Sequence, residues 1–129
     1  MNSRNVLYSL LAGLLLLAAA AYFRRPRPRK EPVNRHPQSL QFYAEVRCRM
    51  HCYRLTEPAV RNVLTAGVIL LNRSDRRYRP CPVFTLQGET GEGRTLRIYL
   101  RQCDRQTTII DLDLLPAGAD CPCPEAKRK

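Results

Sequence analysis

The chain has 129 residues, with 22 lysines and arginines against 11 acidic side chains and a formal net charge of +11. This charge is uneven: residues 1–36 carry +6 and residues 127–129 carry +3, whereas residues 37–126 hold twelve basic and ten acidic side chains. A nucleic-acid-binding domain is expected to carry its basic charge on a folded face, so the overall basicity is not in itself a sign of such binding. About 90 residues remain for folding, which excludes more than one small core.

The most informative segment is the uncharged run from Val6 to Phe23, which consists mostly of leucine and alanine. At about 1.5 Å rise per residue, such a helix spans roughly 27 Å, close to the ~30 Å hydrocarbon core of a bilayer. We therefore expect residues 1–23 to form one transmembrane anchor. A cleaved secretory signal is the alternative, since Ala18–Ala21 supply small residues near the end of the run. The run is longer than a usual signal core, and a basic cluster follows it directly.

A basic, proline-rich linker, residues 24–38, follows the apolar run, and its prolines predict a semi-rigid extended segment. Its basic side chains suit anionic lipid headgroups, each contributing about 1 kcal/mol near a membrane surface. The expected partner is therefore the lipid bilayer. By the positive-inside rule this flank stays in the cytoplasm, which predicts a cytoplasmic domain, with a periplasmic or extracellular domain as the alternative. The membrane-surface candidates are Arg24, Arg25, Arg27, Arg29 and Lys30.

Two helices are predicted at the start of the domain, residues 39–126. The first covers about Tyr43 to Leu55, where four apolar residues recur at spacings of four, four and three. The second begins after Thr56, a suitable N-cap, and Gly67 is placed to end it in a left-handed conformation. The predicted buried face of this second helix consists of Val60, Val63 and Leu64.

An antiparallel sheet of three to four strands is predicted after the helices, within residues 68–71, 83–87, 96–100 and 108–115. A glycine-rich turn joins the second and third segments, and pairing Leu86 with Leu96 places their apolar residues on one face. In the last segment Asp111 and Asp113 alternate with apolar residues, which predicts that both lie on an exposed face. The domain is therefore expected to have an α+β fold, preceded by one transmembrane helix.

Six cysteines form three apparent pairs: Cys48 with Cys52 in the first helix, Cys81 with Cys103 at the open end of the hairpin, and Cys121 with Cys123 in the tail. The hairpin pair is expected to be joined. The helix pair lies on one face because its members are four residues apart. The tail pair is the candidate to cover it.

The helix and tail pairs allow three chemical states. Their four thiols predict either a tetrahedral zinc site or two disulfides, with free buried thiols as the third alternative. The predicted cytoplasmic placement favours zinc or free thiols, whereas six cysteines in so small a domain favour disulfides. His51 lies on the same broad helix face and is a further candidate ligand, although a single histidine there is more often a surface residue.

Several segments carry a family resemblance: Cys48–Cys52, Leu55–Glu57, Val60, Val63–Leu64, Gly67, Pro80–Pro82, Phe84–Gly88, Leu96–Ile98, Cys103, Ile110–Leu112 and the closing Cys-x-Cys. Over residues 40–124 the chain resembles a bacterial family, domain of unknown function 4258, in a cysteine-rich branch whose members often carry an N-terminal membrane helix. The resemblance implies an α+β fold loosely similar to RNase-like toxins of the barnase and RelE type. Arg49 matches the family, but Glu45 stands where many members have a histidine, and Tyr53 stands where they have an arginine.

The favoured function is a membrane-tethered binding or structural module stabilised by cysteine pairs, because no residue set specifies a reaction. An RNase-like or RNA-binding domain is the alternative, with Glu45, Arg49 and Arg97 as catalytic candidates for a metal-independent reaction. Glu45 and Arg49 also have the spacing of an ordinary helix ion pair. A zinc-binding cysteine module is the third reading. The nucleic-acid-binding candidates, in what is otherwise a solvated loop, are Arg73, Arg76, Arg77 and Arg79.

Overall fold

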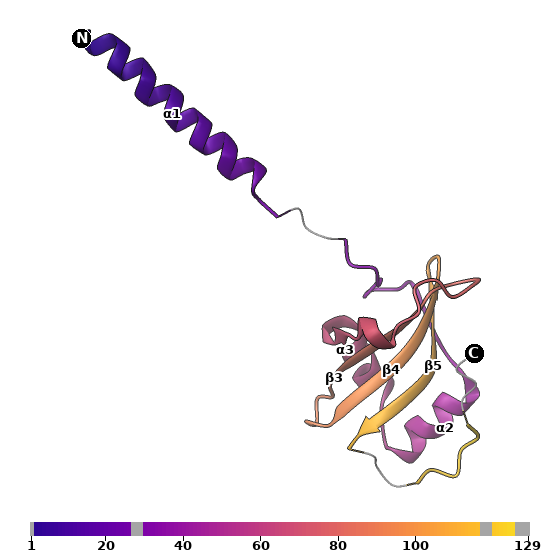
Figure 1. Ribbon diagram of the computed structural model, residues 1–129. Coiled ribbons are helices and arrows are strands. Elements are labelled where there is room, and N and C mark those ends of the chain that lie inside the picture. Colours follow the sequence, from indigo (N-terminus) through magenta and orange to yellow (C-terminus); the bar gives the residue numbers. More distant parts are fainter. Residues whose placement is uncertain (1, 27–29, 117–119, 126–129) are drawn as a thin grey trace. The chain divides into compact units, whose positions relative to one another are not determined.

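The computed structural model describes residues 2–26, 30–116 and 120–125 (Figure 1). The chain divides into two compact units, Met1–Glu31 and Pro32–Lys129. The first unit contains helix α1 (Ser3–Phe23), which buries no residue. By length and composition α1 can cross a membrane, a test that a signal sequence near the N-terminus also passes. The predicted apolar helix is therefore confirmed, and its role as an anchor stays a prediction.

The predicted membrane-surface residues lie just after α1. Arg24 and Arg25 are exposed, and the Arg25 guanidinium lies 5.7 Å from the centre of the Tyr22 ring. Lys30 is also exposed. Arg27 and Arg29 fall outside the described residues, as does the predicted basic tail, residues 127–129.

The folded unit contains a five-stranded sheet in the order β1-β5-β4-β3-β2. Strand β1 is parallel to β5, and the other neighbours are antiparallel. The α+β fold is confirmed, with one strand more than predicted. The strands are β1 (Ser39–Phe42), β2 (Val68–Ile69), β3 (Val83–Glu89), β4 (Thr95–Cys103) and β5 (Gln106–Leu115). The helices are α2 (Ala44–Cys52) and α3 (Glu57–Ala66), and η1 (Leu71–Arg73) is a short 3-10 turn.

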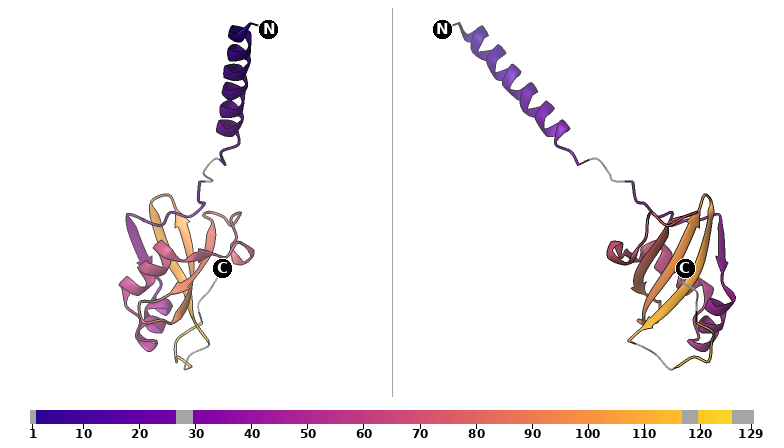
Figure 2. Two further views of the ribbon diagram at one scale, coloured as in Figure 1. Left: turned by 90° about the vertical axis from the view of Figure 1, so that its left-hand side faces the viewer. Right: turned by 45° about the vertical axis from the view of Figure 1, so that its right-hand side comes forward.

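Helices α2 and α3 cover the same face of the sheet. Val46 of α2 and Val63 of α3 belong to one core cluster with Leu96, Ile98 and Leu100 of β4. Alternate residues of a strand point to one face, so these three β4 residues define the covered face. Figure 2 shows the sheet and its helices from two further sides.

Helix α3 follows its prediction closely, but the role of Gly67 differs. Thr56 occupies the N-cap position, and Val60, Val63 and Leu64 are buried. Gly67 has φ −69° and ψ 161°, an extended rather than a left-handed conformation. A Cβ atom there would lie 2.4 Å from the Val63 carbonyl oxygen and 3.0 Å from that of Gln87. Glycine is therefore required by the close approach of α3 to β3, not by backbone handedness.

The hairpin of β3 and β4 has a different register from the predicted one. Leu86 pairs with Ile98 rather than with Leu96, and Phe84 pairs with Leu100. Strand β3 continues through two residues of the glycine-rich segment, which shortens the turn. Because the shift is an even number of residues, the predicted apolar face is preserved.

Strand β5 contains a β-bulge that the sequence pattern does not predict. Leu100 pairs with Ile109, whereas the preceding Tyr99 pairs with Asp111, so β5 carries one extra residue. Such a β-bulge interrupts the alternation of side chains. Simple alternation along residues 108–115 predicts Ile110 on the face of Leu112, but the core cluster contains Ile109 instead, and Ile110, although buried, lies outside that cluster.

The folded unit begins at Pro32, within the predicted linker. Val33 is only 5% exposed and belongs to the core. Asn34 exchanges two hydrogen bonds with the Gln102 side chain, at 2.9 and 2.7 Å. Arg35 Nη1 donates to carbonyl oxygens at the end of α3, including that of Gly67 at 2.8 Å. Residues 32–35 are therefore fastened to the domain rather than acting as a spacer.

Candidate functional site

The cysteines form three disulfides: Cys48–Cys123, Cys52–Cys121 and Cys81–Cys103. The first two join the predicted helix and tail pairs, so the expected convergence of these four residues is confirmed. Their sulfur atoms are bonded to each other, and the zinc and free-thiol alternatives for these cysteines do not hold. Among the described residues no group of three or more His, Cys, Asp and Glu side chains is placed to hold a metal ion. His51 is exposed.

Helix α2 approaches β5 where no strand among the described residues pairs with the outer side of β5. Strand β1 pairs only with residues 106–109, which leaves the later part of β5 at the edge of the sheet. Arg49 Nη1 lies 2.8 Å from Asp111 Oδ1 and 3.6 Å from Asp113 Oδ1. The same nitrogen donates to the Leu112 carbonyl oxygen at 3.2 Å. Arg49 therefore fastens α2 to the open edge of β5.

The environment of Asp111 corrects one prediction and clarifies another. Its side chain is 1% exposed, and that of Arg49 is 18% exposed. Asp111 is thus a buried ionic group rather than an exposed solubilising residue, and Arg49 of α2 lies against it. A buried carboxylate needs such a partner, because its desolvation is costly. Arg49 meets this need from α2, and its ion pairs are with the strand rather than with Glu45.

The sheet face away from the helices carries polar cross-strand rows. One row consists of Gln87, Arg97 and Asp113, which are direct neighbours on β3, β4 and β5. Arg97 donates to Gln87 Oε1 from Nε and Nη2, at 3.2 and 2.9 Å. Tyr99 donates its hydroxyl hydrogen to Asp113 Oδ2 at 3.0 Å. The Arg97 side chain is therefore engaged with an acceptor of the protein itself.

The three catalytic candidates occupy one region, and two of them lie beside the same carboxylate. Arg49 and Arg97 both neighbour Asp113, Arg49 as an ion pair and Arg97 across the β4–β5 ladder. Glu45 lies one helical turn before Arg49 and is half-buried. A phosphate group at Arg49 Nη1 would compete with the carboxylates of Asp111 and Asp113. The arrangement stabilises the junction of α2 with the sheet, and a catalytic use of these residues stays a prediction.

The four nucleic-acid-binding candidates lie in an ordered loop, residues 73–79, which we call the arginine loop. Its backbone is fixed to β3 by a bridge between Asp75 and Val83, with two hydrogen bonds of 2.8 Å. The Tyr78 ring lies under the Arg101 guanidinium, 5.3 Å from its carbon atom. The disulfide of Cys81 closes the loop onto β4. All four arginines of the loop are exposed.

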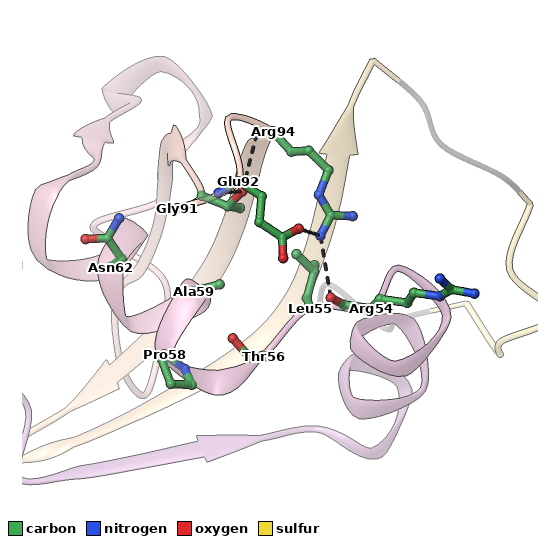
Figure 3. A pocket seen from close by; sticks show the side chains of 10 residues that line it. Arg54, Leu55, Thr56, Pro58, Ala59, Asn62, Gly91, Glu92 and Arg94 are labelled. Atoms are coloured by element: carbon green, nitrogen blue, oxygen red, sulfur yellow. Dashed lines mark hydrogen bonds and ion pairs between the residues drawn. The ribbon is translucent and has the colours of Figure 1, made fainter.

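A cavity of about 410 Å³ lies between the α2–α3 connection and the turn that joins β3 to β4. Arg94 braces it by donating to the Tyr53 carbonyl oxygen at 2.7 Å and to Glu92 Oε2 at 2.9 Å. Figure 3 shows that the Arg54 side chain points away from the cavity, whereas Glu92 extends toward Arg94. The lining residues are Arg54, Leu55, Thr56, Pro58, Ala59, Asn62, Thr90, Gly91, Glu92 and Arg94.

None of the residues predicted as site residues lines this cavity. Its two walls come from segments about forty residues apart, and the strongest link between them is the hydrogen bond from Arg94 to Tyr53. A polar side chain bonded to a distant backbone oxygen leaves no spacing pattern in a sequence. The glycine-rich turn was the only visible signal, and its geometry explains those residues without a ligand.

Comparison with protein-family models, with curated proteins and with solved structures found no match for the chain. The resemblance to the domain of unknown function 4258 family therefore stays a prediction.

Proposed function

We propose that this protein is a membrane-anchored, non-catalytic binding module whose disulfide-stabilised domain lies on the oxidising side of the membrane. One observation carries the proposal: a small folded unit holds three disulfides and follows an apolar helix of 21 residues. Structural disulfides form and persist in periplasmic, extracellular and similar oxidising spaces, and they are rare in the cytosol. A helix of this length spans about 31 Å, enough for the bilayer core.

This placement adopts the periplasmic or extracellular alternative in preference to the cytoplasmic one. The positive-inside rule weighs the basic residues after α1 against Arg4 and the amino terminus before it, and it favours a cytoplasmic domain. Six paired cysteines outweigh that bias, because a reducing compartment would keep them as thiols. The proposed orientation therefore has the amino terminus in the cytoplasm.

A binding role fits the charged groups better than catalysis does. Arg49 is held by two carboxylates, and Arg97 is held by Gln87. A catalytic arginine is expected to meet its phosphate without first breaking a buried ion pair. The exposed arginine loop and the cavity remain as surfaces that can accept a partner.

Fractionation of cells that express the full-length chain tests the proposal. We expect the chain to remain in carbonate-washed membranes, to keep residues 1–23 by intact mass, and to accept six alkyl groups only after reduction. External protease should reach the domain in spheroplasts without lysis. A soluble product without its leader, or cysteines that are alkylated before reduction, would overturn the anchored and oxidised placement. Cleavage of RNA by the purified full chain would overturn the non-catalytic assignment.

A further inference from the structure

The outer edge of the sheet brings exposed apolar side chains together with exposed arginines. The segment from Val68 to Asp75 runs along β3: Val68 pairs with Gln87, the Leu70 amide donates to the Thr85 carbonyl oxygen at 2.8 Å, and Asp75 pairs with Val83. The arginine loop continues directly from this segment. Both therefore belong to one surface strip, residues 68–79.

The basic part of this strip is not neutralised by the folded unit. Within the described part of the chain, Arg73, Arg76, Arg77 and Arg79 take part in no ion pair shorter than 4.0 Å. Asp75 is the acidic residue of the loop, and its carboxylate accepts a hydrogen bond from the Arg77 amide at 3.0 Å. Four guanidinium groups thus face solvent from a backbone that is already ordered.

The apolar part of the strip is unusual for this domain. Val68 is 67% exposed and Leu71 is 58% exposed, and among the described residues of the folded unit these are the two large apolar side chains that are highly exposed. Leu71 shares one 3-10 turn with Arg73. Exposed aliphatic side chains next to arginines are typical of surfaces that enter the headgroup region of a membrane.

The strip also lies close to the point at which the linker joins the folded unit. Asn34, near the start of that unit, is hydrogen-bonded to Gln102. The next residue, Cys103, is joined to Cys81, which closes the arginine loop. Residues 24–31 form the whole connection to α1, and eight residues span at most about 28 Å. A domain anchored through α1 therefore keeps this strip within short reach of the bilayer.

We propose that residues 68–79 dock on the anionic phospholipid headgroups of the bilayer that holds α1, and so lay the folded unit on the membrane surface. This inference rests on the proposed anchorage. Arginine suits the partner because its planar guanidinium binds phosphate oxygens through two hydrogen bonds. RNA offers the same phosphates, but it usually stacks on exposed aromatic rings, and the ring of this loop, Tyr78, lies against Arg101. RNA also gives Val68 and Leu71 no role.

Hydrogen exchange of the full-length chain in nanodiscs tests this surface. One set of discs contains phosphatidylglycerol and the other contains phosphatidylcholine alone. We expect peptides from residues 68–79 to exchange more slowly in the anionic discs, and the difference to disappear at high salt. Equal exchange in the two sets would overturn the docking surface. Elution of the chain with both sets reports anchorage separately, and failure to elute with either would overturn both proposals.

Matched variants distinguish an effect of the strip from an effect of the overall positive charge. The triple variant with Arg73→Gln, Arg76→Gln and Arg77→Gln should lower the equilibrium constant for docking on the order of 100-fold. Each substitution removes one positive charge that anionic headgroups attract. Arg47→Gln, Arg54→Gln and Arg61→Gln remove the same charge from exposed sites elsewhere and should leave the protection nearly unchanged. Leu71→Ser should reduce docking by less than the arginine set.

The controls make each result decisive. Intact disulfides by mass and an unchanged unfolding midpoint show that a variant is folded. An equal loss of protection in both arginine sets would overturn the assignment of the strip. Protection of residues 68–79 by added single-stranded RNA in phosphatidylcholine discs, without an effect of phosphatidylglycerol, would assign the surface to RNA instead.

Discussion

Helices α2 and α3 have similar lengths and cover the same sheet face, but they are held in different ways. Helix α3 buries Val60, Val63 and Leu64, and its stability comes from apolar packing. Helix α2 buries Val46 alone. It is held by two disulfides to the tail and by the ion pair of Arg49 with Asp111.

The difference shows how a small domain can keep a polar helix in place. Nine residues with one buried side chain cannot offset the conformational entropy lost on ordering them. Covalent links reduce that loss by restricting the unfolded chain, and the ion pair aligns the helix with the edge of β5. We therefore expect α2 to depend on its cross-links and α3 to depend on its packing.

Removal of both disulfides of α2 should have the largest effect. The Cys48–Cys123 and Cys52–Cys121 bonds span 75 and 69 residues. Opening a loop of this size, by removing the disulfides that close it, lowers the free energy of unfolding by about 4 kcal/mol. Replacing only Cys48 and Cys123 by serine should cost clearly less, because the other disulfide closes nearly the same loop. Denaturant unfolding of the two variants measures both free energies. If the single and the double removal lower the free energy of unfolding equally, the Cys52–Cys121 bond adds no stability of its own.

Truncation of Arg49 should have the next largest effect. Arg49→Ala removes the guanidinium that lies 2.8 Å from the buried Asp111 carboxylate, a change that costs about 3 kcal/mol. The double variant Arg49→Met with Asp111→Leu should be more stable than the single one, since the buried carboxylate is removed together with Arg49. Arg47→Ala, on the exposed side of the same helix, is the matched control. Similar unfolding free energies for Arg49→Ala and Arg47→Ala would contradict the fastening role.

A packing change in α3 should be smaller but still clear. Val63 is 1% exposed, and Val63→Ala removes two methyl groups from the core, which costs about 2 kcal/mol. Val68→Ala makes the same chemical change at an exposed position and should lie within about 0.5 kcal/mol of the parent protein. Urea unfolding monitored by circular dichroism compares them. A small effect at Val63 would mean that α3, too, is held by something other than packing.

The smallest effect is expected at the surface ion pair of α3. Glu57 Oε1 lies 3.0 Å from Arg61 Nη2, and both side chains are about half exposed. Such pairs contribute about 0.3–0.5 kcal/mol and are screened by salt. Glu57→Gln should therefore change the unfolding free energy slightly at low salt and not at high salt. A loss that high salt does not remove would contradict the assignment to a screened ion pair.

The sequence predicted what local patterns encode. The apolar spacing of α3 and the hairpin are patterns within short segments. The convergence of the helix and tail cysteines was predictable because two pairs of thiols need partners. Strand β1 was missed because it has four residues and follows Pro37 closely, and its parallel partner β5 lies more than sixty residues later. A pairing of that kind leaves no trace in either segment alone.

The candidate site was harder to predict than the fold. Alternation along β5 correctly places Asp111 on the face opposite Leu112, but that face is not open at this point, because Arg49 arrives from another element. Glu45 and Arg49 have the spacing of a helix pair, yet a buried carboxylate is the stronger partner for Arg49. Contacts made by long polar side chains across elements depend on the fold, so only the structure can reveal them.

The two bonds from α2 to the tail have a consequence for limited proteolysis of the folded unit. A protease that cuts the exposed arginine loop splits the chain between Cys52 and Cys121, yet both halves stay joined by sulfur. The nicked molecule should migrate as one species on a non-reducing gel and as two after reduction. Shedding of the carboxyl-terminal half therefore needs a second event, reduction, and one cut alone leaves the protein in place.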